Sequence, residues 1–358
     1  MVKPVLPTLC RSIKIRDKMK ALILTEGGKS IGYGHITRCL AFYHAFEEKG
    51  IKPDIIVCGD DSVKGMLRSK RYKILNWLKA RTEVLKTARE MDIILVDSYL
   101  ADLNFYKKIS IIAKLPVYID DNMRINYPPG VVINSAAYAE KIEYPERDGV
   151  FYLLGSRYAP LRKEFLDAPR KRIRKHVKTV LVTFGGCDPM NVTPKVLKLL
   201  AHKYPGLNKD VVISRGFKYA NKLKNCGDEN TRFIYDPNAD TMKELMIKSD
   251  ITISAGGQTL YELARMGVPS IVITVAENQM RHSRALSRAG VIEHVGCYKG
   301  DRGSNDKIMK KLKAKLDLVI FDKKLRSERC RRGKKIVDGR GVHRAVKKIL
   351  AYIYRRRF

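Results

Sequence analysis

The sequence lacks the motifs that mark several common protein classes. No apolar stretch approaches the roughly 20 residues that span a bilayer, so we expect no transmembrane helix. The seven cysteines include no C-x-x-C pair, and neither an H-E-x-x-H nor a G-x-S-x-G motif is present. These absences argue against a disulfide framework and against the commonest zinc and serine-nucleophile sites. We therefore expect reduced thiols in a cytoplasmic protein that uses no metal and no cofactor.

Acidic residues are scarce relative to basic ones. The chain has 71 Lys and Arg against 37 Asp and Glu, which gives a formal net charge of +34. The densest basic runs, at 170–178, 329–335 and 355–357, contain no interleaved aromatic residues of the kind that stack on bases. A solvated basic face is therefore favoured, no nucleic-acid partner is expected, and nucleic-acid binding stays a distant alternative. A basic surface also suits a diphosphate substrate or peripheral contact with an anionic membrane, without stable insertion.

The length of 358 residues predicts two domains of ordinary size. The first 18 residues are basic and are interrupted by Pro4 and Pro7, so they do not resemble a signal peptide. Met19 stands directly before the first predicted strand, and the sequence leaves open whether translation starts at Met1 or at Met19. We expect an N-terminal extension at 1–19, a Rossmann-like domain at 20–170, a second one at 171–320 and a basic helical tail at 321–358.

Short β-branched segments alternate with longer amphipathic ones, which is typical of βαβ units around a parallel sheet. The segment 36–48 has apolar residues at helical spacing and predicts a helix that packs on the first sheet. A charge-rich stretch around Pro169 separates two series of strands, as expected of an interdomain connection. The predicted strands are 21–24, 54–58, 93–96, 117–119 and 131–133 in the first series, and 179–184, 211–214, 231–234, 251–254 and 270–275 in the second.

Two glycine-rich turns in the second half, 184–189 and 254–262, each follow a predicted strand and precede a helix. Glycine lets the backbone approach a ligand closely, and the N–H groups at a helix start favour a phosphate. The alternative is that each turn only starts a helix. Asp188 with Pro189 fits an N-cap followed by proline at the first helical position, and Thr259 with Glu262 fits a capping box. The residues alone leave both interpretations open.

One histidine in the first half lies in a setting that suits chemistry. His35 follows Gly32-Tyr33-Gly34, between the first predicted strand and the amphipathic helix. An imidazole there can act as a general base near neutral pH, although a lone histidine is more often structural. The paired carboxylates at 60–61 and 120–121 are interpreted as turn residues at strand ends.

A series of motifs in a fixed order gives the sequence a family resemblance. The motifs are IGYGHITRC (31–39), VDSY (96–99), IDDN (119–122), LLGSRYAPLRKEF (153–165), VTFGGCDPMN (182–191), SAGGQTLYELARMGVPS (254–270) and AENQ (276–279). Together they resemble the UDP-sugar hydrolase of the pseudaminic acid pathway, and spore-coat polysaccharide biosynthesis proteins are similar. The resemblance implies an α/β protein with the GT-B fold, in which two Rossmann-like doubly wound domains face a central cleft.

The resemblance also implies a reaction and a set of site residues. The reaction is metal-independent hydrolysis of a UDP-2,4-diacetamido-2,4,6-trideoxyhexose to UDP and free sugar, with inversion, in pseudaminic-like acid or surface polysaccharide biosynthesis. His35 matches the general base, Tyr99 and Asn278 complete the catalytic set, and Gly34 and Asn134 match the sugar side. The residues matched to UDP binding are Gly185, Gly186, Gly256, Gly257, Gln258, Thr259 and Glu262, with Glu262 on the ribose.

The sequence departs from the family pattern at two positions in the half expected to hold the sugar. Leu24 replaces an arginine that is common at the end of the first strand, and Ala136 replaces an asparagine. The UDP-sugar class is therefore better supported than the particular sugar. A GT-B glycosyltransferase, in which an acceptor hydroxyl replaces water in the same site, is the alternative function.

Overall fold

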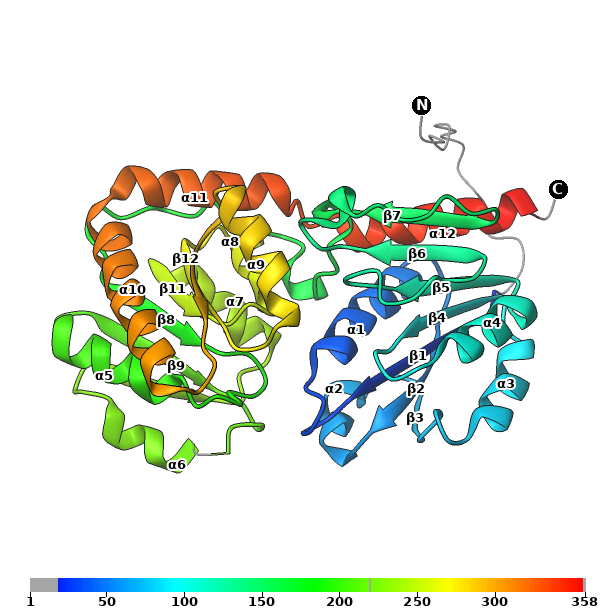
Figure 1. Ribbon diagram of the computed structural model, residues 1–358, viewed down its shortest axis with the longest axis horizontal. Helices are drawn as coiled ribbons and strands as arrows, with labels where there is room; N and C mark the ends of the chain where they lie inside the picture. Colours follow the sequence, from blue (N-terminus) through cyan, green and yellow to red (C-terminus); the bar gives the residue numbers. More distant parts are fainter. Residues whose placement is uncertain (1–18, 219, 357–358) are drawn as a thin grey trace.

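The computed structural model of the protein describes residues 19–218 and 220–356. The expected N-terminal extension lies outside the described residues, except for Met19. Two parallel sheets, each with helices on both faces, stand side by side (Figure 1). The prediction of two Rossmann-like doubly wound domains is therefore confirmed.

The first sheet has the strand order β3-β2-β1-β4-β5-β6-β7, with parallel pairing throughout. Its strands are β1 (Ala21–Gly27), β2 (Asp54–Gly59), β3 (Tyr72–Ile74), β4 (Ile93–Asp97), β5 (Leu115–Ile119), β6 (Gly130–Asn134) and β7 (Val150–Leu154). The helices that follow its strands are α1 (Gly34–Glu47), α2 (Lys64–Leu67), α3 (Arg81–Arg89) and α4 (Leu103–Ile112).

Both faces of this sheet are covered, which explains why its central strands are continuous apolar runs. On one face, Ile23 and Leu95 pack with apolar side chains of α1 and of the C-terminal helix α12 (Gly341–Arg356). On the other face, Leu22 and Val96 pack with α3, α4 and the buried Trp77. Alternate residues of one strand thus serve two cores, and the strands are held rigidly enough to position side chains at their ends.

The second sheet has the order β10-β9-β8-β11-β12-β13, again parallel. Its strands are β8 (Thr179–Thr183), β9 (Asn208–Ile213), β10 (Thr231–Tyr235), β11 (Ile251–Ser254), β12 (Ser270–Thr274) and β13 (Ile292–Cys297). Its helices are α5 (Thr193–Lys203), α6 (Ala220–Leu223), α7 (Ala239–Lys248), α8 (Thr259–Met266), α9 (Asn278–Arg288) and α10 (Arg302–Phe321). The cores on its two faces are built with α5 and α10 on one side and with α7 and α8 on the other.

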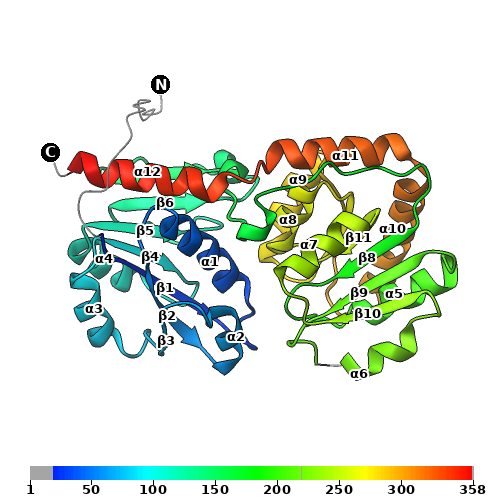
Figure 2. The same cartoon turned by 180° about the vertical axis from the view of Figure 1, so that it is seen from behind.

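The C-terminal helices connect the two halves of the molecule. Helix α11 (Lys323–Ile336) lies along α8, where a Cβ on Gly333 would sit 2.8 Å from the Ala264 carbonyl oxygen. Helix α12 then crosses to the first sheet and inserts Val342, Val346 and Ile349 into its core (Figure 2). The segment expected to form a basic tail therefore packs against both halves of the molecule.

Several local expectations differ from the structure. Strands β3, β7 and β13 were not predicted, and β1 continues to Gly27, so Leu24 lies inside the strand and is buried. Short 3-10 helices also occur, at η1 (Asp61–Val63), η2 (Ala139–Lys141), η3 (Ser156–Tyr158), η4 (Lys163–Phe165) and η5 (Lys224–Cys226). The expected domain limits near residues 170 and 320 stay predictions.

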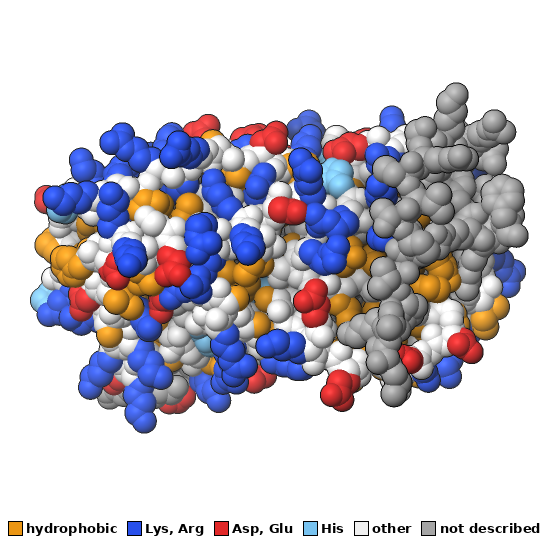
Figure 3. Space-filling model, turned by 90° about the horizontal axis from the view of Figure 1, so that it is seen from above, with side chains coloured by type: hydrophobic (Ala, Val, Ile, Leu, Met, Phe, Trp, Pro, Cys, Tyr) orange, Lys and Arg blue, Asp and Glu red, His pale blue; other side chains and the backbone are white. Residues whose placement is uncertain are grey.

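The surface over the C-terminal helices is rich in Lys and Arg, with acidic and apolar side chains between them (Figure 3). The basic groups are interspersed across the described part of this face. Within residues 19–218 and 220–356, no helix combines the length and apolar character that crossing a membrane requires.

Candidate active site

The strand order defines one edge in each sheet where a ligand is expected. In the first sheet β1 lies between β2 and β4, and in the second β8 lies between β9 and β11, so the connections diverge beside β1 and β8. Open α/β sheets bind ligands outside the carboxyl ends of strands at such switch points. His35 and Tyr99 follow β1 and β4, and the two glycine-rich turns follow β8 and β11. Residues distant in sequence thus gather at two switch points.

His35 is held in the first turn of α1, which begins at Gly34. The loop before it is closed by two backbone hydrogen bonds between Gly28 and Gly32, of 3.0 and 2.7 Å. The imidazole is buried, and its Nδ1 lies 2.7 Å from Oδ1 of Asp97 at the end of β4. A proton on Nδ1 that is donated to this carboxylate leaves the Nε2 lone pair free to accept another. The ring of Tyr99 packs edge-on against the imidazole, with centroids 4.7 Å apart.

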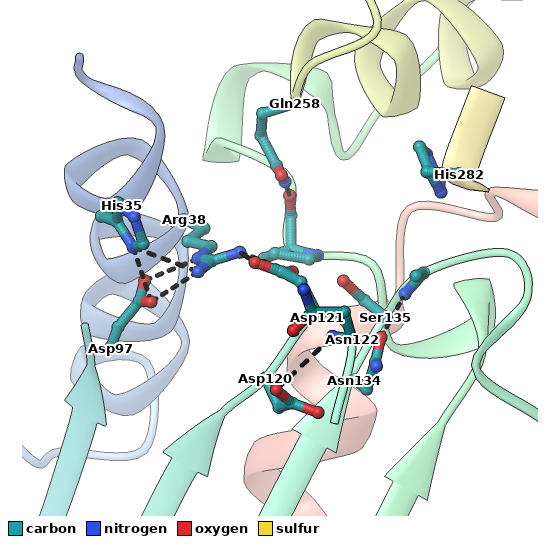
Figure 4. A network of polar contacts seen from close by, with 12 residues as sticks. His35, Arg38, Asp97, Asp120, Asp121, Asn122, Asn134, Ser135, Gln258 and His282 are labelled. Carbon is teal, nitrogen blue, oxygen red and sulfur yellow. Dashed lines mark hydrogen bonds and ion pairs between the residues drawn. The ribbon is translucent and has the colours of Figure 1, made fainter. Parts of the chain in front are cut away.

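Arg38, one turn further along α1, joins Asp97 to the carboxyl end of β5 (Figure 4). Its Nε and Nη2 donate to Asp97 at 2.6 and 2.5 Å, and its Nη1 donates to both oxygens of Asp121 at 2.8 Å. The hydroxyl of Tyr99 also donates to Asp121. Nη2 lies farther from His35 Nδ1, at 3.1 Å, and because the nearer Asp97 carboxylate only accepts, we assign the Nδ1 proton to the bond with Asp97.

The charges of this network reinforce one another. Burial alone would raise the pKa of Asp97, but Arg38 and His35 outweigh it and hold the pKa well below its ordinary value. At Asp121, burial again raises the pKa, but the charge of Arg38 and the hydrogen bond from Tyr99 outweigh burial and lower the pKa. Burial and the nearby Asp121 raise the pKa of Tyr99, so its phenol stays protonated and donates. Both carboxylates are therefore ionised at neutral pH.

A second carboxylate faces the other nitrogen of the imidazole. Oε1 of Glu26, near the end of β1, lies 3.7 Å from Nε2 of His35. Glu26 is only 1% exposed, and it accepts hydrogen bonds from the Ser98 hydroxyl at 2.5 Å and from the Tyr99 backbone N–H at 2.8 Å. His35 therefore lies between two buried acidic groups.

The glycines of the second sheet differ in what surrounds them. Gly185 has φ +76°, and a Cβ there or on Gly257 would meet no atom within 4 Å, so both border open space. A Cβ on Gly256 would instead lie 2.6 Å from Oγ of Ser283, so this glycine permits close packing on α9. A Cβ on Gly186 would lie 2.7 Å from Cδ2 of Tyr33, which belongs to the loop before His35.

Residues at the start of α8 contact the connection between the two sheets. Gln258 Nε2 donates to the Pro160 carbonyl at 2.9 Å, and Glu262 accepts two hydrogen bonds from Arg162, of 2.7 and 2.9 Å. The capping-box interpretation of Thr259 and Glu262 is wrong, because Gln258 occupies the N-cap position and no side chain caps this helix. Glu262 is 3% exposed and forms a buried ion pair with Arg162.

The N-cap interpretation of Asp188 is also wrong in its position. Helix α5 begins at Thr193, with Val192 at the N-cap. Asp188 still serves this helix start, because its carboxylate accepts from the backbone N–H groups of Val192 and Thr193 at 3.0 and 2.8 Å and from the Thr193 hydroxyl at 2.7 Å. The turn after β8 is thus longer than predicted, and Pro189 lies within it.

The two switch-point edges are in contact. Besides the approach of Tyr33 to Gly186, the hydroxyl of Tyr261 donates to the Ser135 carbonyl at 2.6 Å. The Ala137 N–H donates to Nδ1 of His282 at 3.2 Å. Burial lowers the pKa of His282 to about 4, so the ring is neutral and can accept this bond. Figure 4 shows Gln258 and His282 beside the network that contains His35.

The remaining predicted residues lie as follows. Gly34 starts α1 and is exposed, and Asn278 starts α9 and is exposed. Asn134 is buried. Its side chain donates to the Tyr144 hydroxyl at 2.9 Å and accepts from the Ala136 N–H at 2.9 Å. Its amide is committed to this loop rather than to open space. Thr259 is the first residue of α8.

Sequence reasoning did not single out the acidic and basic partners of the site, namely Glu26, Arg38, Asp97, Asp121 and Arg162. Asp120, interpreted as a turn residue, does hold its loop by accepting from the Met123 N–H at 2.7 Å and from the Tyr127 hydroxyl at 3.1 Å. Asp121, one residue later, binds Arg38 instead. The available signal was position, since Glu26, Asp97 and Asp121 all lie at the carboxyl ends of neighbouring strands.

Comparison with known proteins agrees with this architecture. Residues 179–320 match the sequence family described as Glycosyltransferase family 28 C-terminal domain. An uncharacterized protein of Methanocaldococcus jannaschii is 27% identical over 275 residues, which are 73% of this chain and 57% of that protein. The pseudaminic acid cytidylyltransferase and UDP-2,4-diacetamido-2,4,6-trideoxy-beta-L-altropyranose hydrolase of Helicobacter pylori is 24% identical over 77% of this chain and 48% of its own length. The chain thus spans about half the length of these two relatives.

A third relative matches nearly end to end, and solved structures share the fold. The spore coat polysaccharide biosynthesis protein SpsG of Bacillus subtilis is 22% identical over 93% of this chain and 98% of its own length. Acinetobacter baumannii MurG superposes with a TM-score of 0.65 at 12% identity, covering 93% of this chain and 99% of that one. The protein has a GT-B fold like that of glycosyltransferase family 28. Of these relatives, one is named as a nucleotide-sugar enzyme and another as a polysaccharide biosynthesis protein.

Proposed function

We propose that the protein hydrolyses a UDP-activated amino sugar, of the UDP-2,4-diacetamido-2,4,6-trideoxyhexose type, to UDP and the free sugar. The observation that supports this most directly is the His35–Asp97 pair at the β1/β4 switch point, where Tyr33 of the preceding loop contacts Gly186 in a glycine-rich turn of the second sheet. A base on one side and backbone donors on the other are the two parts that displacement of a diphosphate by water requires.

The proposed reaction is a single displacement at the anomeric carbon. The oxygen of a water molecule attacks this carbon as its bond to the UDP oxygen breaks, and the bonding electrons leave on UDP. Nε2 of His35 takes a proton from the water, and Asp97 stabilises the imidazolium through its bond to Nδ1. Attack opposite the leaving group gives inversion, and the imidazolium then returns its proton to solvent.

The proposed UDP site lies at the carboxyl ends of β8 and β11. Gly185 and Gly257 border open space, so a phosphate can approach the backbone there. The N-terminus of α8 adds backbone N–H groups and a favourable helix dipole for the charge that develops on the leaving group. Gln258, Thr259 and Glu262 belong to the same helix start, and Glu262 is the proposed contact for the ribose. Gly186 and Gly256 give these turns the close packing that they need.

Two further residues complete the proposal. Tyr99 packs on His35 and fixes the ring against rotation, while Asn278 at the start of α9 is exposed and free to contact the diphosphate or the sugar. The Helicobacter pylori and Bacillus subtilis relatives support a role in surface-sugar biosynthesis. Gly34 stays the proposed sugar contact of the first sheet, whereas Asn134 would act by shaping its loop.

The test is UDP release from a panel of UDP-diacetamidohexoses by the wild-type protein and by His35→Ala. We expect the substitution to lower kcat by about three orders of magnitude, with UDP affinity unchanged, because His35 is the proposed base. His44→Ala is the matched control, since His44 lies on the same helix α1 and pairs with Glu47 on its outer part. Activity that survives in His35→Ala would refute the proposed base.

A glycosyltransferase is the second candidate function. The match of residues 179–320 to the glycosyltransferase family 28 domain favours it. In that case an acceptor hydroxyl takes the place of water and loses its proton to His35. UDP release that requires an added acceptor, and a glycosylated product detected by mass spectrometry, would establish the transferase over the hydrolase.

A further inference from the structure

Glu26 is a buried carboxylate without a guanidinium or ammonium partner among the contacts of the described residues. It is 1% exposed, and its oxygens accept from the Ser98 hydroxyl and the Tyr99 N–H. The ion pair that the structure gives it is with Nε2 of His35, at 3.7 Å. A buried charge is costly unless it is compensated, so a cation that forms next to this carboxylate is stabilised by it.

The proposed reaction forms that cation. When Nε2 takes a proton, the imidazolium lies between Asp97 at Nδ1, 2.7 Å away, and Glu26 at Nε2, 3.7 Å away. Two carboxylates placed on the two nitrogens stabilise the charged ring more than the neutral one. The orientation of the ring is fixed as well, because turning it would bring Nε2 away from Glu26 and Nδ1 away from Asp97.

The other charged groups near the ring are one guanidinium and two carboxylates, which leave a net negative charge. Arg38 on α1 binds both Asp97 and Asp121, so its positive charge is shared between these two carboxylates. Tyr99, which follows β4, contacts the ring in a T-shaped arrangement, and Cys39 on α1 lies 3.5 Å from Asp97. Glu26 on β1 adds a further negative charge, and among the contacts of residues 19–218 and 220–356 its ion pair is with His35.

We propose that Glu26 is a positioning residue that acts through His35. Its negative charge stabilises the imidazolium that forms as water attacks, and it holds Nε2 toward the substrate side. The proton passes from water to Nε2, and no bond to Glu26 forms. This inference rests on the proposed function, since it requires His35 to act as a base.

The decisive variant is Glu26→Gln, because glutamine keeps the shape and removes the charge. Its carbonyl oxygen can accept from the Ser98 hydroxyl or the Tyr99 N–H but not from both, so one hydrogen bond is lost with the charge. We expect kcat to fall about 10- to 100-fold, which is the scale of one charge about 4 Å away in a partly screened site. KM and the Kd for UDP should stay within about twofold, because Glu26 lies on the first sheet and the proposed UDP site is on the second.

The pH profile separates a role of charge from a role in packing. Without the carboxylate, the imidazole binds its proton less tightly, so the acid limb of the kcat/KM profile should move to lower pH while the plateau falls. Glu26→Asp keeps the charge and should leave the acid limb nearer to its wild-type position, with kcat above that of Glu26→Gln. Glu47→Gln is the control, since it removes an acidic group from the outer part of α1.

The outcomes distinguish this inference from the proposed function. A folded Glu26→Gln protein with wild-type kcat and acid limb, in an enzyme that His35→Ala inactivates, would overturn the role of Glu26 alone. Absence of turnover in the wild type, or turnover that survives His35→Ala, would overturn the proposed function itself. If Glu26→Gln does not fold, Glu26→Asp decides. An acid limb of the kcat/KM profile that moves to lower pH although the charge is retained would contradict the inference.

Discussion

Substitution of Asp97 by Asn tests the centre of the site, because this carboxylate joins the proposed base to Arg38. In the wild type it accepts from Nδ1 of His35 at 2.7 Å and from Arg38 at 2.6 and 2.5 Å. An asparagine oxygen can satisfy only part of this donor set, and its amide then faces donors. The amide is satisfied if it donates to Nδ1, which moves the imidazole proton to Nε2, where the base must be free.

The expected effects are large and separable. By analogy with the loss of the orienting carboxylate in a serine protease triad, kcat should fall about 10³- to 10⁴-fold. Removing one partner of a buried ion pair costs about 3–5 kcal/mol, and the low end applies because Asp121 still binds Arg38. UDP release gives the first quantity and urea unfolding gives the second. Assays are run where both proteins are folded.

The control lies at the other end of the same strand. Asp92, which directly precedes β4, is buried and accepts from the Lys20 N–H at 2.9 Å and from Lys114 at 2.8 Å. Asp92→Asn should therefore destabilise the fold without a specific loss of kcat. If folded Asp97→Asn keeps kcat within about tenfold of the wild type, Asp97 does not orient the base.

Two further predictions address the second sheet and the contact between the sheets. Gly257→Ala should change the free energy of unfolding by less than about 1 kcal/mol, because the added Cβ meets no protein atom, but it should weaken UDP binding at least about tenfold in calorimetry, because that Cβ would occupy the space of the diphosphate. Gly206→Ala, in an open turn of the same sheet, is the control, and equal UDP affinities of the two variants would contradict the phosphate site. His282 has a pKa lowered to about 4 by burial, so between about pH 6.5 and 4 the unfolded chain binds a proton that the folded protein does not. Stability should fall by up to about 3 kcal/mol as pH drops through this window, and His282→Gln, whose amide oxygen can accept from Ala137, should remove that part of the slope measured by urea unfolding at each pH.

The fold could be predicted from the sequence where strands are buried on both faces. β4 and β12 are fully buried, so they form continuous apolar runs that stand out from the helices beside them. β3 has three residues, none of them buried, and gives no such run. β13 contains Gly296, at φ +128°, and pairs with β12 through a register shift, so its apolar pattern is interrupted. Edge strands are set by tertiary pairing that local composition does not record.

The site was predictable only in part, for a physical reason. The glycine-rich turns and His35 stand out because their residue types are unusual at those positions. Asp97 and Arg38 do not, because one carboxylate at a strand end and one arginine in a helix are ordinary until the fold places them 2.6 Å apart. The capping-box error has the same origin. The spacing of Thr259 and Glu262 fits a local motif, but the buried pair with Arg162, 100 residues away, is what the fold forms.

The pair between Glu262 and Arg162 is compatible with a ribose contact and constrains how that contact forms. A carboxylate has about four acceptor positions, and Arg162 uses two of them from one side. The remaining lone pairs can accept ribose hydroxyls, while the guanidinium keeps the carboxylate ionised and fixed. Arg162 belongs to the connection between the sheets, and the Pro160 carbonyl of this connection also accepts a hydrogen bond from Gln258. The nucleotide half of the proposed site is therefore held in place by the segment that connects it to the sheet bearing His35. A change in that connection should alter both the binding of UDP and the alignment of the sugar with the base.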